Sequence, residues 1–397
     1  MHVDLTDPGV FWEGVPHDVF AWLRDNEPIH FQEEKRGPGF WCITRHADVV
    51  KASKDFRHFG SKPNTFDTKD PPDAGIDLMM INMDPPQHTR LRQIVSAGFH
   101  PRIIAYLEHA IREIVTDVLD KVGPKGECDF VTEISAELPM AVICELAGVP
   151  KEDQHKIFEW TNTMIARGED PEYSPSIEHA MRAFMEIQAY AAELTAKRRE
   201  NPGDDLVSAI VTCEIDGEPL SDFEHAMFFV MMMAAGNETT RNLVSGGLLA
   251  LIQHPDQRQL LRDNPELFPK AVEEMLRWVT PVHHFIRTLQ DDVEMHGQTI
   301  KAGEKIALWY PSANRDTTVF DNPNTFDITR DPNPHVTFGG GGPHFCLGFS
   351  LAQLEIKVLF EEVLARLPDM ELNGPVERMR SNFINGIRHM PVSYTPN

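Results

Sequence analysis

The segment GGGGPHFCLG, residues 339–348, carries the side chain best suited to chemistry in this chain. Cys346 follows four glycines and a proline, and His344 precedes it by two positions. Glycines let backbone N–H groups approach a sulfur atom or a flat ligand closely. A helix that begins after the cysteine also favours thiolate over thiol. Three interpretations stay open from this segment: a nucleophile with His344 as its base, a metal ligand, and a glycine turn that happens to contain a cysteine.

A second candidate lies inside an apolar helix, predicted over residues 222–253. Its sequence FFVMMMAAGNETTRNLVSGGLLALI is apolar on nearly all sides, which is typical of a buried helix. Glu238 and Thr239 interrupt it, and a buried carboxylate is costly unless it is paired, hydrated or functional. The neighbouring methionines have a simpler interpretation as core filling: Met231, Met232 and Met233.

Two further pairs of polar residues have helical spacing. Glu274 and Arg277 are three apart in VEEMLRW and can pair on one helix face. MDPPQHTRLRQ predicts a helix capped by Asp84, with a proline in the first helical position. His88 and Arg92 are four apart on that helix and therefore share a face.

Together these motifs resemble the cytochrome P450 family of haem-thiolate monooxygenases. The family's haem loop has a glycine four residues before the cysteine, a basic residue two before and a glycine two after, as here in Gly342, His344 and Gly348. Phe338 lies eight residues before Cys346 instead of seven, and Gly339 occupies the usual phenylalanine position. The longer loop resembles that of a bacterial branch acting on sterols and methyl-branched lipids.

The resemblance implies a role for each motif. Cys346 is the axial thiolate ligand of haem b. Glu238 relays protons from solvent, and Thr239 holds a water molecule on their path. Glu274 and Arg277 buttress the haem loop, with Thr325 in place of the arginine that usually completes this triad. The remaining cofactor contacts, including those to the haem propionates, are His88, Arg92, Ala235, Arg287, Phe338, His344 and Gly348.

The family's substrate positions map onto the loop at 60–82, the break at 168–185 and seven further residues. Most are apolar, so we expect an apolar substrate: a steroid, a terpenoid or a branched-chain lipid. The two histidines could hydrogen-bond a hydroxyl, ketone or carboxylate, or be satisfied by backbone groups. The seven are Met231, Ala234, Ala235, His283, His284, Phe383 and Ile384.

Helices dominate the elements that must position these residues. The fold class we predict is mainly α with a minor β portion, as one cytochrome P450 domain over residues 1–397. Strand signals occur at 40–44 and 293–309, and the tail from 380 reads as a turn-rich hairpin. The predicted helices span 104–122, 138–147, 151–167, 176–200, 222–253, 256–262, 266–278 and 347–366.

The composition and the motifs limit the classes of binding partner that we expect. The formal net charge is −24, which disfavours binding to nucleic acid and to anionic lipids. No apolar run of about 18 residues and no signal peptide is present, so we expect a cytoplasmic, reducing environment and no membrane anchor. No phosphate-binding or dinucleotide-binding fingerprint accompanies the motifs. We therefore expect electrons from a separate ferredoxin and ferredoxin reductase, and a monomeric enzyme.

The resulting hypothesis is a monooxygenase that inserts one oxygen atom into a C–H bond and releases water. The first alternative is a peroxide-driven haem-thiolate peroxygenase, against which the Glu238–Thr239 pair argues. The second is a non-catalytic haem sensor or ligand carrier, which predicts ligand binding without oxidised product. A cysteine hydrolase is the third, and it predicts activity without haem.

Overall fold

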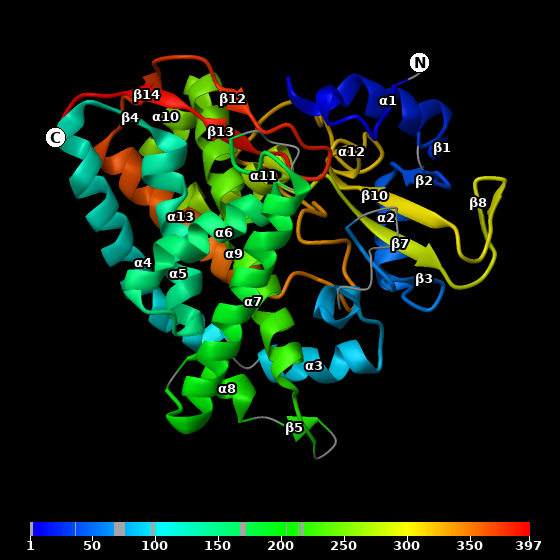
Figure 1. The fold of residues 1–397 in the computed structure, drawn as a ribbon. Helices are drawn as coiled ribbons and strands as arrows, with labels where there is room; N and C mark the ends of the chain where they lie inside the picture. The colour runs from blue at the N-terminus through cyan, green and yellow to red at the C-terminus, as the bar shows by residue number, and fades with distance from the viewer. Residues whose placement is uncertain are drawn as a thin grey trace.

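The computed structural model describes residues 3–35, 37–66, 76–96, 99, 101–166, 172–203, 205–212, 214–215 and 218–397. Helices make up most of it, as the sequence predicted, and the strands β1, β2, β3, β7 and β10 lie together to one side of them (Figure 1). The α-helices are α1 His17–Asn26, α2 His46–Lys54, α3 Gln87–Ser96, α4 Pro101–Val122, α5 Glu137–Ala147, α6 Gln154–Ile165, α7 Ile177–Glu200, α8 Leu206–Val211, α9 Asp222–Gln253, α10 Pro255–Asp263, α11 Phe268–Val279, α12 Tyr310–Ala313 and α13 Phe349–Arg366.

Five strands from both halves of the chain form the largest sheet, in the order β1-β2-β10-β7-β3. Strand β10 pairs parallel to β2 and antiparallel to β7, so the sheet joins the N-terminal strands to residues beyond 280. The strands are β1 Ile29–Gln32, β2 Phe40–Ile43, β3 Phe59–Gly60, β4 Glu127–Asp129, β5 Glu214–Ile215, β6 Glu218–Pro219, β7 His284–Leu289, β8 Val293–Met295, β9 Gln298–Ile300, β10 Lys305–Trp309, β11 Glu371–Leu372, β12 Glu377–Arg378, β13 Ile387–His389 and β14 Pro391–Ser393.

Helix α9 runs through the middle of the helical part (Figure 1). Ser221 caps it, and a reciprocal bond with Glu224 forms a capping box. Its buried residues occupy almost every face, and α5, α7 and α11 pack against it. A helix surrounded in this way has to be apolar all round, which explains the sequence pattern. No helix in the described ranges is long and apolar enough to span a membrane.

Two predicted local features differ in the structure. The C-terminal tail is not a hairpin: β13 pairs with β12, whereas β14 pairs with β11 and β4. Asp84 does not cap α3 through its side chain, because its carboxylate accepts hydrogen bonds from the backbone N–H groups of Ser61 and Lys62. The helix begins at Gln87, after two prolines, and Asp84 thereby fixes the chain next to β3.

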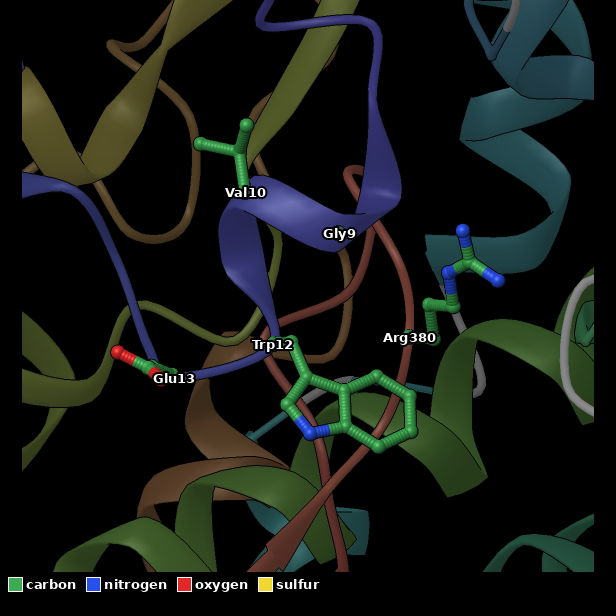
Figure 2. Close-up of a pocket in the computed structure, with 5 residues that line it drawn as sticks. All are labelled: Gly9, Val10, Trp12, Glu13 and Arg380. Atoms are coloured by element: carbon green, nitrogen blue, oxygen red, sulfur yellow. The ribbon is translucent and has the colours of Figure 1, made fainter.

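A hollow on the surface lies where the 3₁₀ helix η1 Pro8–Phe11 meets the chain after β12 (Figure 2). Trp12 and Arg380 border it, and Trp12 is exposed. None of its lining residues contributes to the cavity around Cys346 described next.

Candidate active site

The glycine loop that contains Cys346 packs closely against the backbone of α2. The Cys346 N–H donates to the carbonyl of Phe338 at 2.9 Å, which closes the loop. Gly341 and Gly342 have φ values of +98° and +77°, which favour glycine. A Cβ atom on Gly342 would lie 2.2 Å from the Ser53 carbonyl oxygen. The loop therefore needs glycine both for its turn and for its close approach to α2.

The thiol of Cys346 opens into a cavity, and Cys346 lies three positions before Phe349, the first residue of α13. Burial raises the pKa of the thiol, while the backbone N–H of Gly348 and the charge of Arg92 oppose that rise. The sequence had suggested a thiolate favoured by the helix terminus. The structure shows that desolvation outweighs the N–H donors, so a cation at the sulfur is needed to hold the thiolate form.

Basic and imidazole side chains converge beside this thiol. His88 and His344 lie with ring centroids 4.1 Å apart, and Ser61 Oγ is 2.9 Å from His344 Nε2. Burial lowers the pKa of His88 to about 4 and that of His344 to about 2, so both imidazoles are neutral. The formal charge of the cluster therefore comes from Arg92 and Arg287.

This cluster fits a ligand that carries carboxylates. His88 is 1% exposed and its Nδ1 has no hydrogen-bond partner in the described part of the chain. Arg92 and Arg287 form no ion pair with a carboxylate of the described residues; their guanidinium groups donate to the carbonyls of Phe345 and Ile286. Buried donors without an acidic partner, next to a sulfur ligand and a glycine cradle, match haem with its two propionates.

The two polar residues of α9 point in different directions. Thr239 lines the cavity, and its hydroxyl donates to the Ala235 carbonyl at 2.7 Å. Glu238 is 1% exposed, does not line the cavity, and pairs with Arg241 at 2.6 Å. Arg241 also donates to Asn162 of α6 at 2.9 Å. Glu238, the expected acid, is thus turned toward α6, whereas the next residue, Thr239, is turned toward the cavity.

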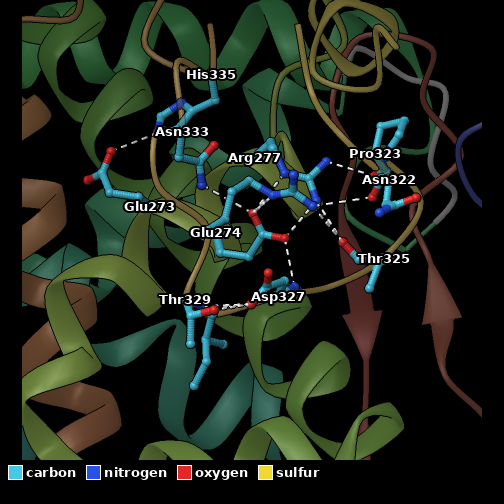
Figure 3. A network of polar contacts seen from close by, with 12 residues as sticks. Glu273, Glu274, Arg277, Asn322, Pro323, Thr325, Asp327, Thr329, Asn333 and His335 are labelled. Atoms are coloured by element: carbon cyan, nitrogen blue, oxygen red, sulfur yellow. Dashed lines mark hydrogen bonds and ion pairs between the residues drawn. The ribbon is translucent and has the colours of Figure 1, made fainter.

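Glu274 and Arg277 form the centre of a buried network (Figure 3). The guanidinium of Arg277 binds both carboxylate oxygens of Glu274, at 2.7 and 2.8 Å. The sequence suggested an incomplete triad because Thr325 replaces an arginine. That expectation was wrong, because Arg330 supplies a guanidinium nitrogen 3.1 Å from Glu274. Thr325 takes part through its carbonyl, which accepts from Arg277 at 3.1 Å.

Strand parity explains which residues of β7 face the cavity. Alternate side chains of a strand point to opposite faces, and Phe285 and Arg287 line the cavity. His284 points the other way, onto Trp309, with ring centroids 4.6 Å apart. His283 packs against Phe11, and burial lowers its pKa far below the usual range. The two histidines therefore lie behind the cavity wall, not in it.

The other predicted site residues divide into two groups. Those that line the cavity are Met231, Ala235, Phe338 and Gly348, with His88, Arg92, Thr239, Arg287, His344 and Cys346. Those that do not are Ala234, Phe383 and Ile384, with Glu238, His283 and His284. Of the predicted substrate loops, 67–75 and 168–171 lie outside the described residues, and from 172–185 no side chain reaches this cavity.

Several lining residues were missed from the sequence. Phe285 of β7 and Tyr310, which follows β10 at the start of α12, both line the cavity. The parity with Arg287 could have indicated Phe285. Glu355 of α13 also lines the cavity, and its position on the same face as Leu351 and Ala352 could have revealed it.

Comparisons with known proteins agree with this site. The family described as Cytochrome P450 matches residues 16–368. A steroid C26-monooxygenase of Mycolicibacterium smegmatis is 42% identical over 99% of this chain and 93% of its own length. A methyl-branched lipid omega-hydroxylase of Mycobacterium tuberculosis is 42% identical over 97% of this chain and 93% of its own length. The structure of Mycobacterium marinum cytochrome P450 CYP268A2 in complex with pseudoionone has a TM-score of 0.93 and 36% identity, covering 99% of both chains.

The fold and the site define a haem-thiolate oxidoreductase. The chain belongs to the cytochrome P450 family, and its relatives are monooxygenases. Haem is therefore the cofactor that the thiol, the glycine loop and the basic cluster accommodate. The fold class predicted from the sequence is confirmed by the same comparisons.

Gly342→Ala is expected to lower the free energy of unfolding by more than the strain of a side chain at positive φ alone would explain. A side chain at positive φ costs about 1–2 kcal/mol, and crowding against Ser53 adds about 1–3 kcal/mol. Gly303→Ala is the matched control, because Gly303 has φ +83° and open space around it. Urea unfolding of both variants measures the difference. Equal losses of unfolding free energy would show that the close approach to α2 has no energetic weight.

Proposed function

We propose that this protein hydroxylates a steroid or a methyl-branched lipid at an apolar carbon, with electrons from a ferredoxin. Full-length similarity at 42% identity to enzymes named for these two substrate classes carries the proposal. A solved cytochrome P450 from Bacillus megaterium in complex with testosterone, 30% identical with a TM-score of 0.87, supports a steroid in the same fold.

The lining of the cavity supports an apolar substrate. Apolar side chains from η3 Met80–Asn82, α9, β7 and the residue two positions before β7 line it, namely Met80, Ile81, Phe228, Met231, Met232, Phe285 and Val282. Apart from Glu355, its charged and imidazole groups are those of the cluster beside Cys346. A substrate carboxylate in the apolar part would lack a partner, so an apolar end of the substrate faces the reacting centre.

Each part of the site has a distinct task in this reaction. Bound haem supplies oxygen activation, and the Cys346 thiolate donates electron density that favours O–O cleavage. His88, Arg92, Arg287 and His344 hold the propionates. Thr239 holds a water molecule at the cavity wall, and Glu238 passes protons to it once its carboxylate turns from Arg241.

A substrate panel tests the proposal. Sterols, methyl-branched lipids, straight-chain fatty acids and terpenoids are added to the haem protein, and the spin-state shift is recorded. Compounds that shift the spectrum are then incubated with ferredoxin, ferredoxin reductase and NADPH, and products are identified. Hydroxylated steroid or branched lipid is expected. Oxidation of straight-chain fatty acids or terpenoids alone would contradict the substrate class, and faster turnover with peroxide would contradict the ferredoxin.

Glu238→Gln is expected to lower product formation by about 10²-fold, because the amide keeps the shape but cannot release a proton. Asp222→Asn on the same helix is the control, since Asp222 is exposed and pairs with Arg199 at the surface. Product per NADPH consumed is measured for both. A Glu238→Gln enzyme within twofold of the wild type would remove Glu238 from the proton path.

A further inference from the structure

Helix α7 exposes an apolar stripe to solvent. Ile177, Met181 and Met185 are 54%, 55% and 57% exposed, more than any other large apolar side chain in the described part of the chain. They are four residues apart, so they lie on one side of the helix. The stripe continues toward the end of α7 through exposed small residues, Ala189, Ala192 and Ala196.

This stripe is not needed for the packing of α7 within one chain. The buried residues of α7, among them Ile187 and Leu194, lie on the opposite side of the helix, and α7 packs against α6, α8 and α9. The helix lies on the outside of the helical part (Figure 1). From Ile177 to Ala196 the stripe is roughly 30 Å long at 1.5 Å per residue. A continuous exposed apolar surface of this kind marks an interaction site.

The charges beside the stripe identify the partner. Four exposed charged residues follow the same side of it and form no ion pair among the described residues: Glu178, Arg182, Glu193 and Lys197. Their signs alternate along the helix, so a copy of α7 that runs in the opposite direction presents the complementary order. Glu178 and Lys197 have their midpoint between residues 187 and 188, and so do Arg182 and Glu193.

We propose that α7 is the contact surface of a homodimer, in which two copies of this helix pack antiparallel about a two-fold axis near residues 187 and 188. A two-fold contact uses the same surface on both copies. Met185 of each copy then packs next to Ala189 of the other, and Arg182 of each faces Glu193 of the other. The proposal replaces the monomer expected from the sequence, and it does not depend on the substrate.

A lipid surface is the other candidate for this stripe. The flank of the stripe contains Glu178, Glu186 and Glu193 beside two basic residues, and the whole chain has a formal net charge of −24. Anionic membranes attract clusters of lysine and arginine instead. The charges of α7 therefore favour a second copy over a lipid surface.

Sedimentation velocity of the haem-loaded protein, from micromolar to near-millimolar concentration, tests the dimer. One helix per copy is a small contact beside the roughly 800 Å² per partner of standard interfaces, so we expect dissociation in the micromolar range. Met185→Glu should raise the dissociation constant at least about tenfold. Leu372→Glu is the matched control, because Leu372 is 37% exposed on β11, and it should leave the constant unchanged. A wild type that is monomeric throughout, or a Met185→Glu dimer as tight as the wild type, overturns the proposal.

A charge exchange tests the antiparallel arrangement. Arg182→Glu and Glu193→Arg should each weaken the dimer about threefold to tenfold. The double variant Arg182→Glu/Glu193→Arg should restore it. The two positions lie about 16 Å apart along one helix, so the restoration can only arise between copies. A double variant weaker than either single variant contradicts this arrangement.

Glu186 provides a test in the opposite direction. In the proposed dimer the two copies of Glu186 lie about 4.5 Å apart along the helix direction, where their like charges repel. Glu186→Gln should therefore lower the dissociation constant. Asp117→Asn on α4 is the control for the change in net charge, because Asp117 is exposed and distant in sequence, and it should have no effect. A weaker dimer in Glu186→Gln would place the axis elsewhere.

Flotation with phosphatidylcholine vesicles separates the two occupants. A protein that stays monomeric and floats with the vesicles would show that the stripe binds lipid, and the dimer proposal would fall. Haem content shows whether each variant folds, and if Met185→Glu does not fold, the charge exchange decides. None of these measurements requires turnover, so a failure of the proposed hydroxylation leaves this inference standing.

Discussion

Cys346→Ala is expected to abolish both thiolate ligation and hydroxylation. The cavity contains one sulfur ligand at the base of the glycine loop, and alanine leaves nothing to bind iron there. The reduced, carbon-monoxide-treated protein should lose the absorption band that is diagnostic of sulfur-bound haem. Product formation with ferredoxin should fall to background, because the electron donation that favours O–O cleavage is gone.

Cys128→Ala is the matched control for this experiment. Cys128 is buried in β4, and burial raises the pKa of its thiol to about 11, so it is an unreactive core residue. The variant should keep the band and the activity. If Cys346→Ala retained the sulfur-ligand band, another residue would be the ligand and the assignment of the whole site would fall.

Arg277→Leu is expected to have the largest effect on stability. Arg277 and Glu274 are both fully buried, and removing one partner of such a pair costs about 3–5 kcal/mol. The backbone carbonyl of Asn314 also loses its bond from Arg277 at 3.0 Å, and that of Pro323 loses one at 2.8 Å while it keeps a bond from Arg315. These carbonyls lie in the segment that leads to the haem loop, so lower haem content on expression should accompany the loss of unfolding free energy.

Two companions make the Arg277 result interpretable. Lys270→Ala removes an ion pair with Asp331 in which the two side chains are 48% and 66% exposed, and it should cost less than about 1 kcal/mol. The double variant Arg277→Leu/Glu274→Leu also removes the buried carboxylate, which in the single variant keeps Arg330 but loses both bonds from Arg277, and it should recover part of the loss. Urea unfolding gives all three values. If Arg277→Leu were as stable as Lys270→Ala, the buried network around Glu274 and Arg277 would not be a major contributor to the free energy of unfolding.

The helices and the thiol loop could be predicted because their signals are local. The predicted span of α9, residues 222–253, agrees with the structure, since the capping box at Ser221 and the continuous apolar run lie within one segment. The spacing around Cys346 likewise depends on neighbours in sequence. Glycines at that loop meet a steric need that the sequence alone indicates.

The remainder depends on contacts between distant segments. Arg330 reaches Glu274 from 56 residues away, and no pattern near either residue announces the pair. Strand β7 was not predicted, and its parity decides that Phe285 faces the cavity while His284 does not. The direction of Glu238 follows from Asn162 on a separate helix, which holds Arg241. Side-chain orientation is set by such partners, which motif spacing cannot supply.

The parallel pairing of β10 with β2 has a consequence for biosynthesis. Trp41 and Ile306 occupy facing positions, and about 265 residues separate them. At translation rates of about 5–20 residues per second, β2 waits roughly 13 to 50 seconds for its neighbour to leave the ribosome. During that interval the nascent hairpin of β1 and β2 offers an open edge to any passing strand, so slower elongation or a shortage of chaperones should reduce the yield of folded protein more than its final stability would suggest.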